Sequence, residues 1–214
     1  MGAAESMRDT TDSGLPTGFR SVGFLLVVSG PSGVGKGTLV DRLIAARPDC
    51  SLSISATTRA RRAHETDGVQ YFFLARDEFE RRRGEGQFLE SAEVHGQLYG
   101  TPRGFVEERL RQGRIVVLEV DVQGGASIRR ADKSAVSVFV SPPSIDALRQ
   151  RLLGRGTDRP EVVDQRLRNA PTEMAQMREY DYVVLNDDLE QATTRLVAIV
   201  DAERSRVSRV ESST

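Results

Sequence analysis

The chain of 214 residues contains a single cysteine, Cys50, and no tryptophan. One cysteine cannot form an internal disulfide, which excludes a disulfide-stapled secreted fold and suits a reducing compartment, so we expect a cytoplasmic protein. No apolar run approaches the roughly 20 residues that a membrane-spanning helix needs, and no signal-peptide core is present. We therefore expect no membrane partner.

Neither sign of charge is in excess, because 30 Lys and Arg accompany 31 Asp and Glu, for a formal net charge of -1. A general nucleic-acid binder carries a basic surplus, so we expect no nucleic-acid partner. Hydrophobic residues at 38% and charged residues at 29% are typical of a globular protein. The sequence leaves open whether the chain forms a homo-oligomer.

The order of apolar segments predicts an α/β fold. Residues 1–20 lack a periodic apolar stripe and are rich in Ser, Thr, Gly and Asp, which predicts a disordered leader. Beyond them, continuous apolar runs alternate with helical stretches, as in a parallel sheet covered by helices on both faces. The predicted strands are 24–28, 115–118, 136–140 and 182–185, and the predicted helices are 36–46, 103–112, 144–153, 160–176 and 188–205.

Two local features modify this pattern. Short alternating segments with aromatic residues, at 69–73 and 88–94, flank a short predicted helix at 76–84. They predict a small, mainly antiparallel sheet inserted into the parallel core. Pro171 falls inside a predicted helix, which we expect to bend or restart there.

The strongest motif is a glycine-rich P-loop that follows a predicted strand and opens a predicted helix. Its glycines let successive backbone N–H groups point at phosphate oxygens, and the helix N-terminus adds a favourable dipole. Lys36 adds a mobile positive charge for the transferred phosphate. We expect a nucleoside triphosphate to bind Gly30, Pro31, Ser32, Gly33, Val34, Gly35, Lys36, Gly37 and Thr38.

Gly37 departs from the commonest form of this motif, which places a Ser or Thr there to contact Mg²⁺. Thr38 follows it. We therefore expect Mg²⁺ to be held mainly by phosphates and water, near Thr38.

The inserted region supplies an anion clamp beside carboxylates. Arg59 and Arg62, three residues apart, suit a terminal phosphate together with a tyrosine hydroxyl. Glu90 and Asp121 suit a base edge that is rich in N–H donors. Guanine has that edge in its ring N–H and exocyclic amine, whereas adenine presents a bare nitrogen there, which would repel a carboxylate.

These motifs, in this order, resemble the guanylate kinases over about residues 22–205. The resemblance implies Mg²⁺-dependent phosphoryl transfer from ATP to GMP or dGMP, on a P-loop kinase core with a GMP-binding insertion and a helical lid. It assigns residues 21–54, 104–143 and 167–214 to the core, 55–103 to the insertion and 144–166 to the lid. The GMP-binding residues that it implies are Ser55, Arg59, Arg62, Tyr71, Glu90, Tyr99, Thr101 and Asp121.

The resemblance also implies a group of catalytic cations and one residue beside the adenine of ATP. The catalytic residues are Lys36, Arg151, Arg155 and Arg166, and the adenine-side residue is Asn186. Arg61 and His64 depart from the family, which usually has Pro and then Gly around the second clamp arginine. We expect a more mobile loop in which Arg61 competes for the phosphate. Leu98 replaces a common tyrosine, with no expected effect because Tyr99 is retained.

Two alternatives remain. The first is a non-catalytic binding module with a guanylate-kinase-like fold, against which the intact P-loop argues. The second is a related P-loop kinase for another phosphorylated acceptor, against which Glu90 and Asp121 argue.

Overall fold

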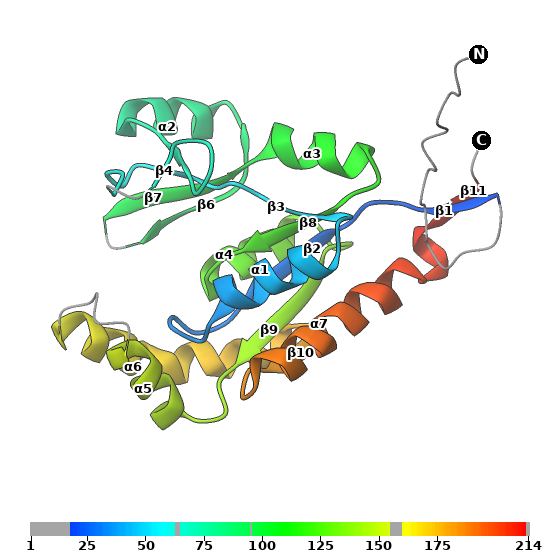
Figure 1. The fold of residues 1–214 in the computed structure, drawn as a ribbon. Helices are drawn as coiled ribbons and strands as arrows, with labels where there is room; N and C mark the ends of the chain where they lie inside the picture. Colours follow the sequence, from blue (N-terminus) through cyan, green and yellow to red (C-terminus); the bar gives the residue numbers. More distant parts are fainter. Residues whose placement is uncertain (1–17, 63–64, 95, 155–159, 213–214) are drawn as a thin grey trace, which may run out of the picture.

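The computed structural model describes residues 18–62, 65–94, 96–154 and 160–212 (Figure 1). At its centre lies a five-stranded, all-parallel sheet with the strand order β10-β9-β2-β8-β3. The strands of this sheet are β2 (Leu25–Ser29), β3 (Cys50–Leu52), β8 (Ile115–Glu119), β9 (Val136–Ser141) and β10 (Tyr182–Leu185).

Helices follow the strands of the core, as the alternating pattern predicts. The strands and helices predicted for the core are present, and their ends differ from the prediction by no more than one residue. None of the described helices combines the length and the apolar character needed to cross a membrane. The helices are α1 (Lys36–Ala46), α2 (Arg76–Gly84), α3 (Arg103–Arg111), α4 (Val122–Ala131), α5 (Ile145–Gly154), α6 (Pro160–Ala175) and α7 (Leu189–Arg204), with two 3₁₀ turns, η1 (Gln176–Glu179) and η2 (Val207–Arg209).

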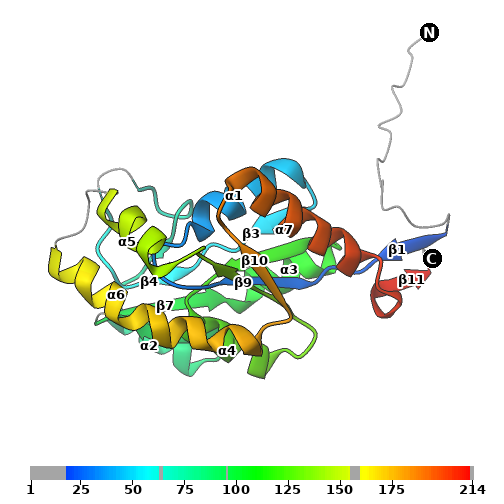
Figure 2. The ribbon, with the colours of Figure 1, turned by 90° about the horizontal axis from the view of Figure 1, so that it is seen from below.

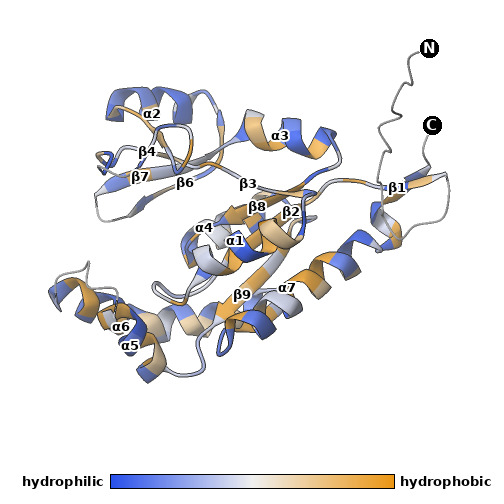
Figure 3. Ribbon diagram, in the orientation of Figure 1, coloured by the Kyte–Doolittle hydropathy of each residue, from blue (hydrophilic) through white to orange (hydrophobic). Residues whose placement is uncertain are grey.

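Strand β2 shows why the sheet is apolar on both faces. Successive side chains of a strand point to opposite faces, so Leu25 and Val27 pack against α3 and α4, while Leu26 and Val28 pack toward α1 and α7. Figure 3 shows the apolar strands between helices whose outer faces are polar, and Figure 2 shows the helices from below. The expected parallel sheet with helices on both faces is confirmed.

A second sheet, of four strands, lies between residues 56 and 102 with the order β5-β4-β7-β6. Two of its pairings are antiparallel, β4 with β7 and β6 with β7, and one is parallel, β4 with β5. The expected small, mainly antiparallel sheet is thus confirmed. Its strands are β4 (Ala56–Thr57), β5 (Phe72–Phe73), β6 (Phe88–Val94) and β7 (Gln97–Pro102).

This small sheet has a hydrophobic core of its own, closed by α2. Phe79 of α2 is fully buried and stacks on Phe88, with 4.5 Å between the ring centroids. Leu98 packs in the same cluster and is only 1% exposed. Leu98, where the resemblance leads us to expect a tyrosine, therefore serves packing.

Helix α4 is an element that the sequence patterns above do not predict. Gly124 and Gly125 lower its intrinsic helix propensity by about 1 kcal/mol each relative to alanine. The helix forms because Asp121 caps its N-terminus, accepting a 2.7 Å hydrogen bond from Gly124 N, and because Ile128 is buried against the sheet. Asp121 at the N-cap was the available signal.

The two ends of the described chain meet in an antiparallel ribbon of β1 (Phe19–Ser21) and β11 (Val210–Ser212). The prediction of a disordered leader up to residue 20 is therefore wrong for Phe19 and Arg20. Their partner strand, β11, lies at the other end of the chain, and no local apolar pattern predicts such a pairing. The preceding residues, 1–17, lie outside the described residues.

Helix α6 runs through Pro171 without a break, so the predicted restart at this proline does not occur. An internal proline costs about 3 kcal/mol, because it removes one hydrogen bond and its ring meets the carbonyl four residues earlier. Burial of Val163, Leu167 and Ala170 along one face of the helix offsets this cost. The helix also crosses residue 166, the expected boundary between lid and core.

Candidate active site

The P-loop connects β2 with α1 at the carboxyl edge of the parallel sheet, and its backbone explains its glycines. Gly30 has a φ of 145°, and a Cβ added there would lie 2.2 Å from the carbonyl oxygen of Val140. Gly35 has a φ of 97° at the N-cap of α1. Both conformations lie in the region that glycine alone adopts without strain. The motif predicted from the sequence is therefore built as a turn whose glycines are required.

Lys36 is the first residue of α1, and its side chain turns back over the loop. Its Nζ donates hydrogen bonds to the carbonyl oxygens of Gly30, at 2.7 Å, and Pro31, at 3.2 Å. The ammonium charge is thereby held inside the loop, beside the backbone donors that the motif provides for phosphate.

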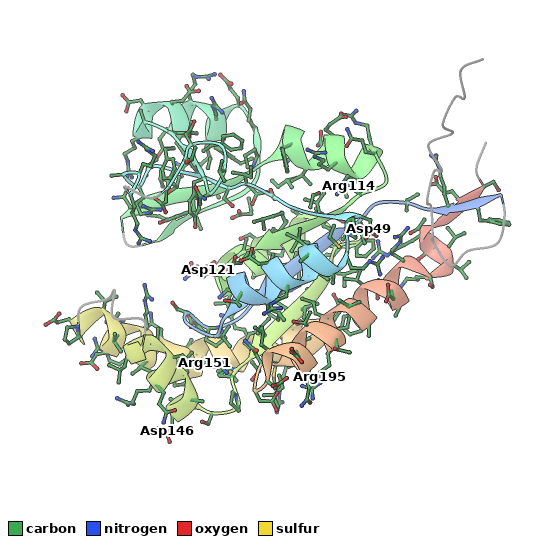
Figure 4. The ribbon with its side chains drawn as sticks, in the orientation of Figure 1. Asp49, Arg114, Asp121, Asp146, Arg151 and Arg195 are labelled. Carbon is green, nitrogen blue, oxygen red and sulfur yellow. The ribbon has the colours of Figure 1, made fainter. Side chains whose placement is uncertain are left out.

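Two side chains from other parts of the chain, Arg151 and Asn186, donate hydrogen bonds to the P-loop. Arg151 of α5 donates to the carbonyl oxygens of Val34, at 3.0 Å, and Asn186, at 2.6 Å. The Nδ2 of Asn186 donates to the same oxygen of Val34 at 2.8 Å. Figure 4 shows Arg151 on α5 and Asp121 nearer the inserted sheet. The contact of Asn186 with adenine stays a prediction, and Arg155 lies outside the described residues.

A cavity of about 310 Å³ lies between the P-loop and the inserted sheet. The predicted site residues that line it come from both parts of the fold. These residues are Lys36, Ser55, Tyr71, Glu90, Tyr99 and Asp121.

Two carboxylates face this cavity from different elements. Thr101, which is fully buried, donates a 2.8 Å hydrogen bond to Oε1 of Glu90 and so orients that carboxylate. Burial raises the pKa of Glu90, the Thr101 bond opposes the rise, and the charge of Asp121 adds to it. Oδ1 of Asp121 caps α4, so the helix fixes this second carboxylate. The pair forms an acceptor-rich wall, while the predicted contact of Thr101 with a base remains a prediction.

The clamp arginine Arg59 is held by a carboxylate whose role we do not predict from the sequence. Its Nη2 donates to Oε1 of Glu65 at 2.7 Å, and its guanidinium lies 5.5 Å from the ring centroid of Tyr71. Hydrogen bonds from Arg59 and from the backbone of Arg62 lower the pKa of Glu65 to about 2. The rings of Tyr71 and Tyr99 meet edge to face with centroids 6.0 Å apart. Glu65, three residues after Arg62, was the available signal.

Comparisons with known proteins find a matching family and relatives of known name. The family model described as guanylate kinase matches residues 23–203. The chain belongs to the guanylate kinase family. A guanylate kinase of Symbiobacterium thermophilum is 51% identical over 187 residues, covering 87% of this chain and 89% of that protein. One of Thermotoga maritima is 45% identical, covering 87% and 90%.

A solved structure extends this likeness to the fold. The crystal structure of guanylate kinase from Anaplasma phagocytophilum matches with a TM-score of 0.75 and 35% sequence identity. The match covers 90% of this chain and 92% of that one. The α/β architecture described above is therefore the guanylate kinase fold.

The loop that departs from the guanylate kinase pattern is held by hydrogen bonds between its side chains and its backbone. The backbone N–H of Arg62 donates to Oε2 of Glu65 at 2.7 Å. Nη1 of Arg61 donates to the backbone carbonyl oxygen of Glu65 at 2.6 Å. Arg61 thus bonds within the loop, and both its expected competition for the phosphate and the expected mobility of the loop stay predictions. The side chain of Arg62 is exposed, and His64 lies outside the described residues.

Two further groups complete the site of this guanylate kinase fold. Arg166 lies on α6; burial raises the pKa of Glu173 on the same helix, and the charge of Arg166 opposes that rise. Glu119, which we do not predict from the sequence, ends β8 and lines the cavity. A Cβ on Gly37 would lie 3.4 Å from Oε2 of Glu119. The carboxylate thus occupies the space next to the missing Ser or Thr of the P-loop.

Proposed function

We propose that this chain catalyses reversible phosphoryl transfer from ATP to GMP, giving ADP and GDP, and accepts dGMP as well. One observation carries the proposal: Lys36 of the P-loop and Glu90 and Tyr99 of the inserted sheet line the same cavity. A triphosphate on the P-loop and a nucleotide on the insertion would therefore meet with their phosphates facing each other.

The two ends of GMP are recognised by different chemistry, from the insertion and from the N-terminus of α4. Glu90 and Asp121 accept hydrogen bonds from the ring N–H and exocyclic amine of guanine. Arg59 binds the phosphate, with the hydroxyls of Tyr71 and Tyr99 beside it. Ser55, Arg62 and Thr101 complete the proposed GMP site.

The chemical step needs charge compensation rather than a general base. An oxygen of the GMP phosphate attacks the γ-phosphorus, the bond from that phosphorus to the β–γ bridging oxygen breaks, and ADP leaves with the bonding electrons. The attacking phosphate carries roughly -1.5 to -2 charge near neutral pH, so no side chain has to remove a proton. The obstacle is repulsion between two polyanions, which Lys36, Arg151, Arg155 and Arg166 reduce in this proposal.

Magnesium belongs to the same proposal, and the oxygen donors near the P-loop suit it. Thr38 is exposed at the start of α1, and the carboxylate of Glu119 lies beside Gly37. Hard oxygen donors of this kind suit Mg²⁺, which keeps several waters and is completed by substrate phosphates. When bound, Mg²⁺ neutralises charge that develops on the β- and γ-phosphates.

A substrate panel tests the proposed function. ADP release from Mg·ATP would be measured with GMP, dGMP, AMP, CMP and UMP, and without an acceptor. Turnover with GMP and dGMP, far above that with the other acceptors, supports the proposal. Binding of GMP without turnover would instead favour the non-catalytic module, and a preference for another acceptor would favour the related kinase.

The cellular setting completes the proposal. We place the reaction in the cytoplasm, where thiols stay reduced. Cys50 is buried in the hydrophobic core of the protein, and burial raises the pKa of its thiol to about 12. The thiol is therefore inert as a nucleophile. The absence of nucleic-acid and membrane partners stays a prediction.

A further inference from the structure

Glu173 lies on α6 about two helical turns after Arg166, and it contacts the P-loop. Its Oε2 accepts a hydrogen bond of 3.4 Å from the backbone N–H of Ser32. The half-buried carboxylate also feels the positive charges of Lys36 and Arg166, and the negative charge of Asp121. Glu173 therefore stands among groups of both proposed substrate sites.

The donor that Glu173 engages is one of the backbone N–H groups of the P-loop. Such donors in a P-loop point at phosphate oxygens. A carboxylate oxygen and a phosphate oxygen are both anionic acceptors, and the single N–H of Ser32 cannot serve both at full strength. A triphosphate seated on the loop would also place its negative charge beside the carboxylate.

The contact is of a kind that a ligand can displace. The distance of 3.4 Å exceeds the usual range for N–H···O bonds. Burial raises the pKa of Glu173, while the Ser32 bond and the charges of Lys36 and Arg166 oppose the rise. The ionised carboxylate is thus desolvated and only partly compensated.

We propose that Glu173 is an internal competitor of the triphosphate, which occupies the Ser32 N–H until the phosphates of ATP displace it. The inference rests on the proposed function, because it takes ATP as the ligand. Since Glu173 and Arg166 share α6, the exchange also links ATP binding to the position of a proposed catalytic arginine. Glu173 acts here through the P-loop and contacts neither the guanine base nor its phosphate.

Calorimetric titration with a non-hydrolysable ATP analogue and Mg²⁺ tests the proposal. E173Q keeps the shape of the side chain but removes its charge, and E173A removes the contact as well. Both variants should bind the analogue about 3- to 10-fold more tightly than the wild type, the range expected when a competing charged hydrogen bond is weakened in E173Q or lost in E173A. Their affinity for GMP, titrated in the same way, should be unchanged.

Glu161 offers a matched control, because it is an exposed glutamate on the same helix. E161Q removes the same charge and should bind the analogue as the wild type does. Equal or weaker binding by E173Q and E173A, with the wild type binding normally, overturns the inference but leaves the proposed function standing. A wild type that binds no analogue overturns both. Thermal unfolding of each variant confirms that the proteins compared are folded.

Discussion

Arg59 donates a 2.7 Å hydrogen bond from Nη2 to Oε1 of Glu65, whose side chain is only 6% exposed. The other oxygen of Glu65 accepts from the backbone N–H of Arg62. A single carboxylate thus fixes both the guanidinium of one clamp arginine and the backbone of the other. Arginines held in this way would lose less side-chain freedom on binding a phosphate, the role proposed for Arg59 and Arg62.

Glu65→Gln should weaken the binding of GMP without changing the binding of ATP. Glutamine keeps one acceptor oxygen, but its amide group cannot accept from the second donor, so Arg59 and the loop lose their common anchor. We expect KM for GMP to rise about 10-fold, the scale of one charge-assisted hydrogen bond, with KM for ATP unchanged. A coupled assay of ADP release measures both constants.

Glu78 provides the control, because it lies on α2 of the same inserted region, where it pairs with surface arginines. Glu78→Gln should leave both constants unchanged. A Glu65→Gln enzyme with normal KM for GMP would show that the pair Arg59–Glu65 has no role in holding the phosphate.

Lys36→Ala should leave the fold intact and lower turnover at least 100- to 1,000-fold, because its charge is needed most in the transition state. Lys133, the other lysine of the chain, lies two residues after the end of α4, and Lys133→Ala supplies the matched control, which should turn over as the wild type does. Single-turnover rates with saturating ATP and GMP separate the two variants. A Lys36→Ala rate within a few-fold of the wild type would remove this lysine from the reacting phosphates.

The P-loop and the core around it could be predicted from the sequence because their signals are local. The buried run of β2 and the glycines 30 and 35 lie within a few residues of one another, so one short segment contains the pattern that predicts the loop. The same holds for α1, whose predicted bounds are the observed ones.

The remainder of the site depends on contacts between distant segments. Asn186 and Arg151 both reach the carbonyl oxygen of Val34, more than a hundred residues away along the chain. Glu173 reaches Ser32 over a similar separation. No spacing rule within one element encodes such pairs. The sequence does not single out Glu65 either, because a single carboxylate in a charged loop is usually solvated.

Glu90→Gln should impair the recognition of guanine while leaving the binding of ATP nearly unchanged. The amide replaces one acceptor oxygen by a donor, which would face a guanine N–H and leave it unpaired at a cost of about 1–3 kcal/mol. We expect kcat/KM for GMP to fall roughly 10- to 100-fold, with a small effect on KM for ATP. Glu93, exposed on the same strand, gives the control Glu93→Gln, which should behave as the wild type.

The same substitution should make the protein without substrate more stable at neutral pH. Burial raises the pKa of Glu90 above the ordinary value of 4.5, and Asp121 adds to the rise. Because the folded-state pKa is the higher one, ionisation of Glu90 costs folding stability as pH increases from the ordinary value through the raised one. Glutamine does not titrate, and its carbonyl oxygen can still accept the hydrogen bond of Thr101.

The advantage of Glu90→Gln should therefore be full above the raised pKa and should disappear below pH 4.5, where both states of the wild type are protonated. Chemical denaturation at a series of pH values, with Glu93→Gln alongside, measures the difference in unfolding free energy. A constant difference across this pH range, or a less stable Glu90→Gln protein at pH 7, would contradict the prediction. Lower stability of the wild type, together with loss of GMP turnover in Glu90→Gln, would show that this carboxylate weakens the fold and serves GMP binding, where guanine N–H donors would supply its partners.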